Sequence, residues 1–136
     1  MKRLSILLPL LVTLSAPVAY ATEASKDQVR AQVSTLTELR QQGSSQPERY
    51  ALDQPEGVEA CRSEAAPALA QVQAIQDQVV GYEHLGYRIN LTLASQALKE
   101  CLGCSDATAS CDNAQSLLDR VSQQFLSKPE PAAATP

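Results

Sequence analysis

Aromatic side chains are scarce in this chain. Its 136 residues include no tryptophan and one phenylalanine. A core made of leucine, valine, isoleucine and alanine buries less apolar area per residue than one rich in aromatic side chains. Covalent cross-links would help to stabilise such a core, so we expect the four cysteines to matter for the fold.

Residues suited to catalysis are also few. His84 is the only histidine, which leaves mainly carboxylates for general acid–base chemistry. The sequence has no Ser, His and Asp set in a recognisable order, no glycine-rich phosphate loop and no histidine pair. We therefore predict a protein that is not an enzyme, with no catalytic residue, no cofactor and no metal site.

Positive charge is in deficit. The chain has 11 Lys and Arg residues against 15 Asp and Glu, and its formal net charge is −4 at pH 7. Proteins that bind DNA or RNA need basic surfaces to meet the phosphates. Nucleic acid is therefore not an expected partner.

Long apolar runs are absent beyond the N-terminus. There, Lys2 and Arg3 precede an apolar run from Leu4 to Val18, and Ala19-Tyr20-Ala21 follows. This order is typical of a cleaved secretory signal, which we place at residues 1–21. The alternative, an uncleaved anchor, is disfavoured by two prolines in the run. We expect a periplasmic or secreted bacterial protein without stable membrane insertion after cleavage.

Helical periodicity dominates the mature chain. A capping box at Ser25-Lys-Asp-Gln28 opens the first helix, and apolar residues then recur at intervals of three and four. We predict an all-α fold, a small four-helix bundle in one domain over residues 22–127. The expected helices cover about 26–42, 64–80, 87–101 and 113–127. Residues 128–136 form a Pro- and Ala-rich tail that we expect to be disordered.

The segment from Gly81 to Tyr87 allows two interpretations. An apolar stripe continues through it without a slip, which would favour one long central helix over 64–101 with flanking helices. That helix would be about 57 Å long and would carry Cys61 far from the other thiols. A disulfide needs α-carbons about 5.5 Å apart. We therefore favour a helical hairpin that turns within this segment.

The cysteines are Cys61, Cys101, Cys104 and Cys111. An even number of thiols behind an export signal predicts two disulfides. Four thiols allow three pairings, and spacing alone does not choose among them. Because the hairpin brings the first two to the same end, we predict pairs 61–101 and 104–111.

A rival interpretation uses Cys101 and Cys104 as a C-x-x-C redox dithiol or as part of a metal site. Redox dithiols normally lie at a helix N-terminus, where the helix dipole lowers a thiol pKa. Here the pair ends a predicted helix, and a second C-x-x-C pair for zinc is missing. A structural role is the stronger prediction, and thiol–disulfide or metal handling is the alternative.

Candidate binding residues gather at the hairpin turn. Tyr82, His84, Leu85 and Tyr87 bring two tyrosines, the sole histidine and an apolar side chain to one bend, and aromatic residues in loops are common recognition groups. The plainer interpretation is that both tyrosines cover the end of the bundle. A second candidate surface is a stripe on the first helix that could meet a partner helix or a second copy: Val29, Val33, Leu36 and Leu39.

Together these features predict an exported, non-enzymatic binding or interaction protein of the bacterial envelope. An inhibitor, an immunity protein, a chaperone or an assembly accessory would each fit. The expected partner is another envelope protein, and the sequence predicts neither its identity nor the oligomeric state.

Overall fold

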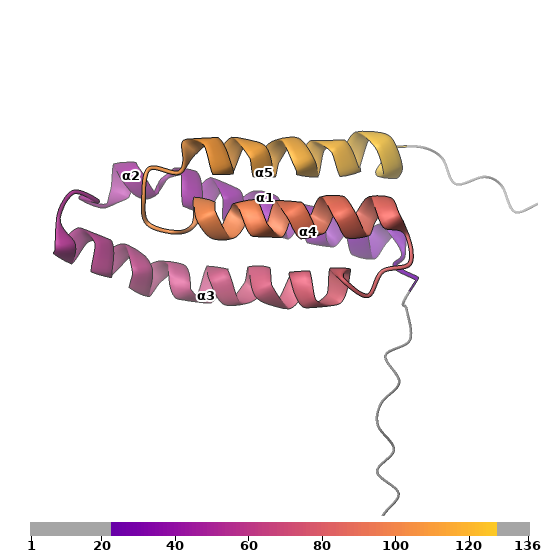
Figure 1. The fold of residues 1–136 in the computed structure, drawn as a ribbon, viewed down its shortest axis with the longest axis horizontal. Coiled ribbons are helices and arrows are strands. Elements are labelled where there is room, and N and C mark those ends of the chain that lie inside the picture. Colours follow the sequence, from indigo (N-terminus) through magenta and orange to yellow (C-terminus); the bar gives the residue numbers. More distant parts are fainter. Residues whose placement is uncertain (1–22, 128–136) are drawn as a thin grey trace, which may run out of the picture.

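The computed structural model describes residues 23–127, which form a bundle of antiparallel helices (Figure 1). The predicted small all-α bundle with two disulfides is confirmed. The predicted signal peptide and tail lie outside the described residues. The elements are α1 (Lys26–Ser44), α2 (Gln46–Arg49), α3 (Pro55–Val79), α4 (Leu85–Cys101) and α5 (Thr108–Val121), which continues into a π-helical turn (Ser122–Leu126).

Helix α4 is the centre of the bundle. It packs against α1, α3 and α5, and in Figure 1 it lies in front of α1, between α5 and α3. Its buried face supplies Leu91, Ala94 and Leu98, each fully buried. As predicted from composition, the core consists mainly of aliphatic side chains, among them Leu36, Val72, Val79, Leu118 and Val121.

Helix α1 starts as its capping box predicts. The Ser25 hydroxyl accepts a hydrogen bond from the Gln28 amide at 3.1 Å. The apolar stripe of α1 faces the bundle, because Val29, Leu36 and Leu39 are all buried in the core. The suggestion that this stripe is exposed for a partner is therefore wrong.

The chain between α3 and α4 folds back, so the hairpin is confirmed and the continuous helix over 64–101 is wrong. Helix α3 ends at Val79, and α4 begins at Leu85 and runs in the opposite direction (Figure 1). The hairpin brings Cys61, near the start of α3, to within 5.9 Å (Cα–Cα) of Cys104, just beyond the end of α4.

Helix α3 is longer than predicted at its N-terminal end. It begins at Pro55 instead of near 64, and Pro67 lies inside it. The hydrogen bond that Pro67 cannot donate would go to the carbonyl of Ser63, and both residues are exposed, so water can replace it. The additional turns bury Cys61 and Ala65 in a second apolar cluster.

The disulfides join Cys61 to Cys104 and Cys101 to Cys111, so the predicted pairing is wrong. The reason lies in the short helix α2, within the segment expected to be a simple connection. Its buried Gln46 accepts a hydrogen bond from the Cys104 amide at 3.0 Å and donates one to the Leu102 carbonyl at 3.2 Å. This double contact holds Cys104 at φ 56°, a left-handed conformation expected of glycine.

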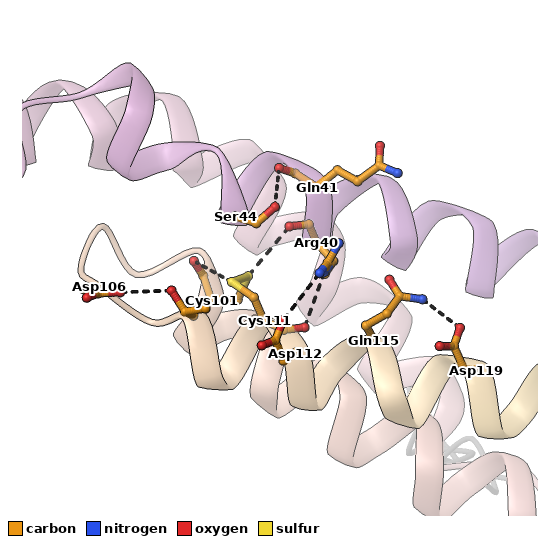
Figure 2. A network of polar contacts seen from close by, with 10 residues as sticks. Arg40, Gln41, Ser44, Cys101, Asp106, Cys111, Asp112, Gln115 and Asp119 are labelled. Carbon is orange, nitrogen blue, oxygen red and sulfur yellow. Dashed lines mark hydrogen bonds and ion pairs between the residues drawn. A yellow bond between two sulfur atoms is a disulfide. The ribbon is translucent and has the colours of Figure 1, made fainter.

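Helix α5 begins one turn earlier than the predicted start at 113. Its first residue is Thr108, and Cys111 lies within its first turn. The Cys101–Cys111 disulfide buries that turn against the end of α4. Figure 2 shows α1 covering this bond, where Arg40 Nε donates to the Cys111 carbonyl at 3.4 Å and Arg40 Nη2 pairs with Asp112 at 3.6 Å.

Candidate functional site

The predicted binding segment forms the turn and the start of α4. His84 caps the helix, because its Nδ1 accepts a hydrogen bond from the Tyr87 amide at 3.3 Å. The His84 ring lies 4.2 Å from the Tyr87 ring and 5.1 Å from the Phe125 ring (centroid distances). A Cβ added at Gly86 would come within 2.4 Å of Phe125, so only glycine permits this close packing.

Tyr82 lies in the core instead of on the surface. It is 1% exposed, and its hydroxyl donates a hydrogen bond to Gln32 Oε1 at 2.8 Å. The Gln32 amide nitrogen in turn donates to Gln78 Oε1 at 3.0 Å. Burial raises the pKa of the Tyr82 phenol, and the hydrogen bond from Gln32 opposes this only in part. The network joins α1, α3 and the turn, so this tyrosine stabilises the hairpin.

The Tyr82 pKa predicts a loss of stability at alkaline pH. The folded pKa is above the unfolded value of 10.0, so the stabilisation is complete below that pH and is lost as the pH rises through the folded pKa. We expect Tyr82→Phe to unfold more easily at neutral pH by about 1 kcal/mol, because Gln32 Oε1 loses its donor. The variant should lose less stability than the parent between about pH 9 and about pH 11.

Urea unfolding across this pH range provides the measurement. The matched control is Tyr50→Phe, since Tyr50 is half-buried in the second apolar cluster, away from the glutamine network. A Tyr82→Phe variant that kept the full alkaline loss of the parent would assign the loss to other groups.

A cavity of about 760 Å³ opens at the same end of the bundle, and His84 and Tyr87 form part of its wall. The first turn of α1 forms another part. There Arg30 donates hydrogen bonds to the Asp27 carboxylate at 2.8 Å and to the Leu126 carbonyl at 3.2 Å. The arginine charge is thus used inside the protein, where it ties α1 to the end of the α5 segment.

An exposed apolar surface lies beside the turn, on the outer side of α4. It consists of Val80 at the end of α3 together with Leu85, Ile89 and Leu93 of α4, which are 54%, 57%, 53% and 45% exposed. We call these four residues the α4 patch. A shallow groove of about 360 Å³ runs along it and has an almost entirely apolar lining. Large contiguous apolar surfaces are uncommon on monomers and often mark binding sites.

The structure therefore separates the four predicted binding residues. Tyr82 is in the core, His84 and Tyr87 border the end cavity, and Leu85 belongs to the α4 patch. The sequence prediction missed the rest of the patch, because it placed Ile89 and Leu93 on the stripe that continues the buried face of α3. The missed signal is that α4 has a second apolar row, spaced by four residues, opposite Leu91 and Leu98.

The cysteines show no dithiol. Cys101 and Cys104 belong to different disulfides, and both are buried. All four cysteines of the chain are in disulfides. Within residues 23–127 there is no group of three His, Cys, Asp or Glu side chains placed to hold a metal ion. Each cysteine that the sequence singled out thus joins two helical segments.

No helix in the described part of the chain is long and apolar enough to cross a membrane. None of the family models, curated proteins or solved structures compared with the chain matches it.

Proposed function

We propose that this chain is an exported, non-enzymatic helical protein that binds a protein partner in the bacterial envelope through the α4 patch. An inhibitor, an immunity protein, a chaperone and an assembly accessory all act in this way. The observation that carries the proposal is the patch itself. Its four aliphatic side chains are about half exposed, whereas the large aliphatic residues on the inner faces of α1, α3, α4 and α5 are buried.

The compartment is supported by two independent features. Two disulfides in a small domain are typical of proteins that fold in an oxidising environment, such as the periplasm. The N-terminal sequence has the charged start, apolar centre and small residues of a secretory signal. The alternative of thiol–disulfide or metal chemistry loses its main support, since Cys101 and Cys104 are not bonded to each other.

A site-specific cross-linking experiment tests the proposal. A photoreactive residue at Leu93, in the patch, should capture a different protein in cells that export the chain. The same residue at Gln123, exposed on the turn after α5, is the matched control and should not. Ile89→Glu places a charge in the centre of the patch and should reduce the captured product by at least about tenfold.

The size of this effect follows from desolvation. A carboxylate that must be buried against an apolar partner loses its hydration without gaining a hydrogen bond. In the free protein position 89 faces solvent, so the substitution should leave the thermal midpoint nearly unchanged. Capture at Leu93 that is insensitive to Ile89→Glu, or equal capture at Gln123, would contradict a role for the patch.

A further inference from the structure

We propose that the α4 patch is self-complementary and that a second copy of this chain docks on it, with the two α4 helices antiparallel about a two-fold axis. The inference rests on the proposed function in one respect, namely that both assign protein binding to this patch. It goes further because it names the occupant of the patch in the absence of another partner.

The centre of the patch is apolar and uncovered. No helix of residues 23–127 lies on the side of α4 opposite α1 (Figure 1). Leu85, Ile89 and Leu93 follow one another at intervals of four and form a ridge along this side. The nearest cation, Arg88, is turned toward the hairpin, where its Nη1 donates to the Tyr82 carbonyl at 3.3 Å. A second apolar ridge can therefore approach without burying this charge unpaired.

The two ends of the ridge carry opposite charges. Glu83 is exposed just before the start of α4. Lys99 lies in its last turn, and the Lys99 ammonium donates to Gln73 Oε1 on α3, which holds it on the α3 side of the helix. The outer side of α4 thus has an acid at its N-terminal end and a base at its C-terminal end. Such an arrangement is complementary to a reversed copy of itself.

The spacing of the charges agrees with the apolar ridge. The midpoint between Glu83 and Lys99 is position 91, which is also the midpoint between Ile89 and Leu93. A two-fold axis at this level sets Ile89 against the partner's Leu93. Each charged residue is eight positions, or about 12 Å, from that level. Glu83 then lies at the height of the partner's Lys99, and the symmetry repeats the pair.

The size of the patch sets the expected affinity. Stable interfaces bury about 800 Å² on each partner, and four half-exposed aliphatic side chains provide less than this. We therefore expect a weak dimer with a dissociation constant on the order of 100 µM. A dimer of this strength would cover the apolar surface in concentrated protein and still release it to a tighter partner.

Charge reversal provides the test, using protein purified from cells that export the full chain. Sedimentation velocity would be measured from about a tenth to about ten times the expected dissociation constant. Glu83→Lys alone and Lys99→Glu alone should each weaken the dimer by about tenfold, because each creates two like-charge contacts. The double variant should dimerise as the parent does. A mixture of the two single variants should form dimers more readily than either alone, because both contacts then pair opposite charges.

Glu38→Lys, on exposed α1, changes the net charge equally and should have no effect. The differences among variants should shrink at about 1 M salt. A parent protein that stays monomeric throughout, or a mixture no better than the single variants, would overturn the self-complementary dimer. Monomeric protein that still captures a different protein at Leu93 would leave the proposed function intact. A dimer without such capture would support this inference against the proposed function.

Discussion

Replacing Cys61 and Cys104 by alanine is expected to lower the free energy of unfolding by about 4 kcal/mol. This disulfide closes a loop with a sequence separation of 43, and its loss releases the unfolded chain from that constraint. Small domains are stable by roughly 5–15 kcal/mol in total. The thermal midpoint should therefore fall by roughly 15 °C.

The second disulfide is the matched control. Cys101 and Cys111 have a sequence separation of 10, so alanine at both positions should cost about 2.7 kcal/mol. Equilibrium unfolding in guanidinium without reductant would give both values. The first bond also ties the satellite cluster around α2 to the end of α4, which the second does not. A loss for the 61/104 variant no larger than that for the 101/111 variant would contradict the expectation.

The same variants test the pairing by thiol counting. Cys61→Ala with Cys104→Ala leaves Cys101 and Cys111, which are partners, so the unfolded protein should show no free thiol. Cys61→Ala with Cys101→Ala leaves two cysteines from different disulfides, and two free thiols should appear. The opposite result would restore the pairing predicted from the sequence.

The parts of the fold that depend on local pattern could be predicted. The Ser25 cap and the core faces of α1 and α4 follow from helical spacing, because one side of each helix must be buried. The hairpin required a non-local argument. Since unpaired thiols are disfavoured in an oxidising compartment, Cys61 had to return to the other cysteines, and this requirement correctly outweighed the unbroken apolar stripe.

The parts that failed depend on contacts between distant segments. The choice between Cys101 and Cys104 as the partner of Cys61 is made by Gln46, whose side chain holds the Cys104 backbone in a left-handed conformation. The burial of Tyr82 depends on Gln32, which is 50 positions away. Neither glutamine belongs to a motif, so the sequence pattern gave no reason to place them in the core.

The α4 patch failed for a different reason. Helix α4 carries apolar residues on two faces, and periodicity does not say which one the bundle covers. In the hairpin, α1, α3 and α5 cover the face of Leu91 and Leu98. The row of Leu85, Ile89 and Leu93 therefore remains in contact with solvent, and burial in the structure was needed to identify it as a binding surface.

Gly43→Ala is expected to destabilise the protein by about 2 kcal/mol or more, although alanine favours helices. Gly43 lies in the last turn of α1, directly against the Cys101–Cys111 disulfide (Figure 2 shows this contact region). A Cβ at this position would be 2.6 Å from Cys101 Sγ and 2.9 Å from the Cys101 carbonyl oxygen. Backbone and a cross-linked sulfur cannot swing aside as a flexible side chain can, so α1 must move away from α4. Overpacking of this kind costs about 1–3 kcal/mol or more, which exceeds the gain of about 1 kcal/mol from helix propensity.

Gly81→Ala is the matched control, because a Cβ there meets only the Gln78 carbonyl oxygen at 3.5 Å, an ordinary contact. Gly81 does not have a positive φ, so alanine should be neutral or stabilise the protein by up to about 1 kcal/mol through the unfolded state. Guanidinium unfolding of both variants gives the comparison. If Gly43→Ala were as stable as Gly81→Ala, α1 would not approach the Cys101–Cys111 bond closely enough for glycine to be required there. The packing of α1 over the end of α4 would then have to be looser than the structure shows.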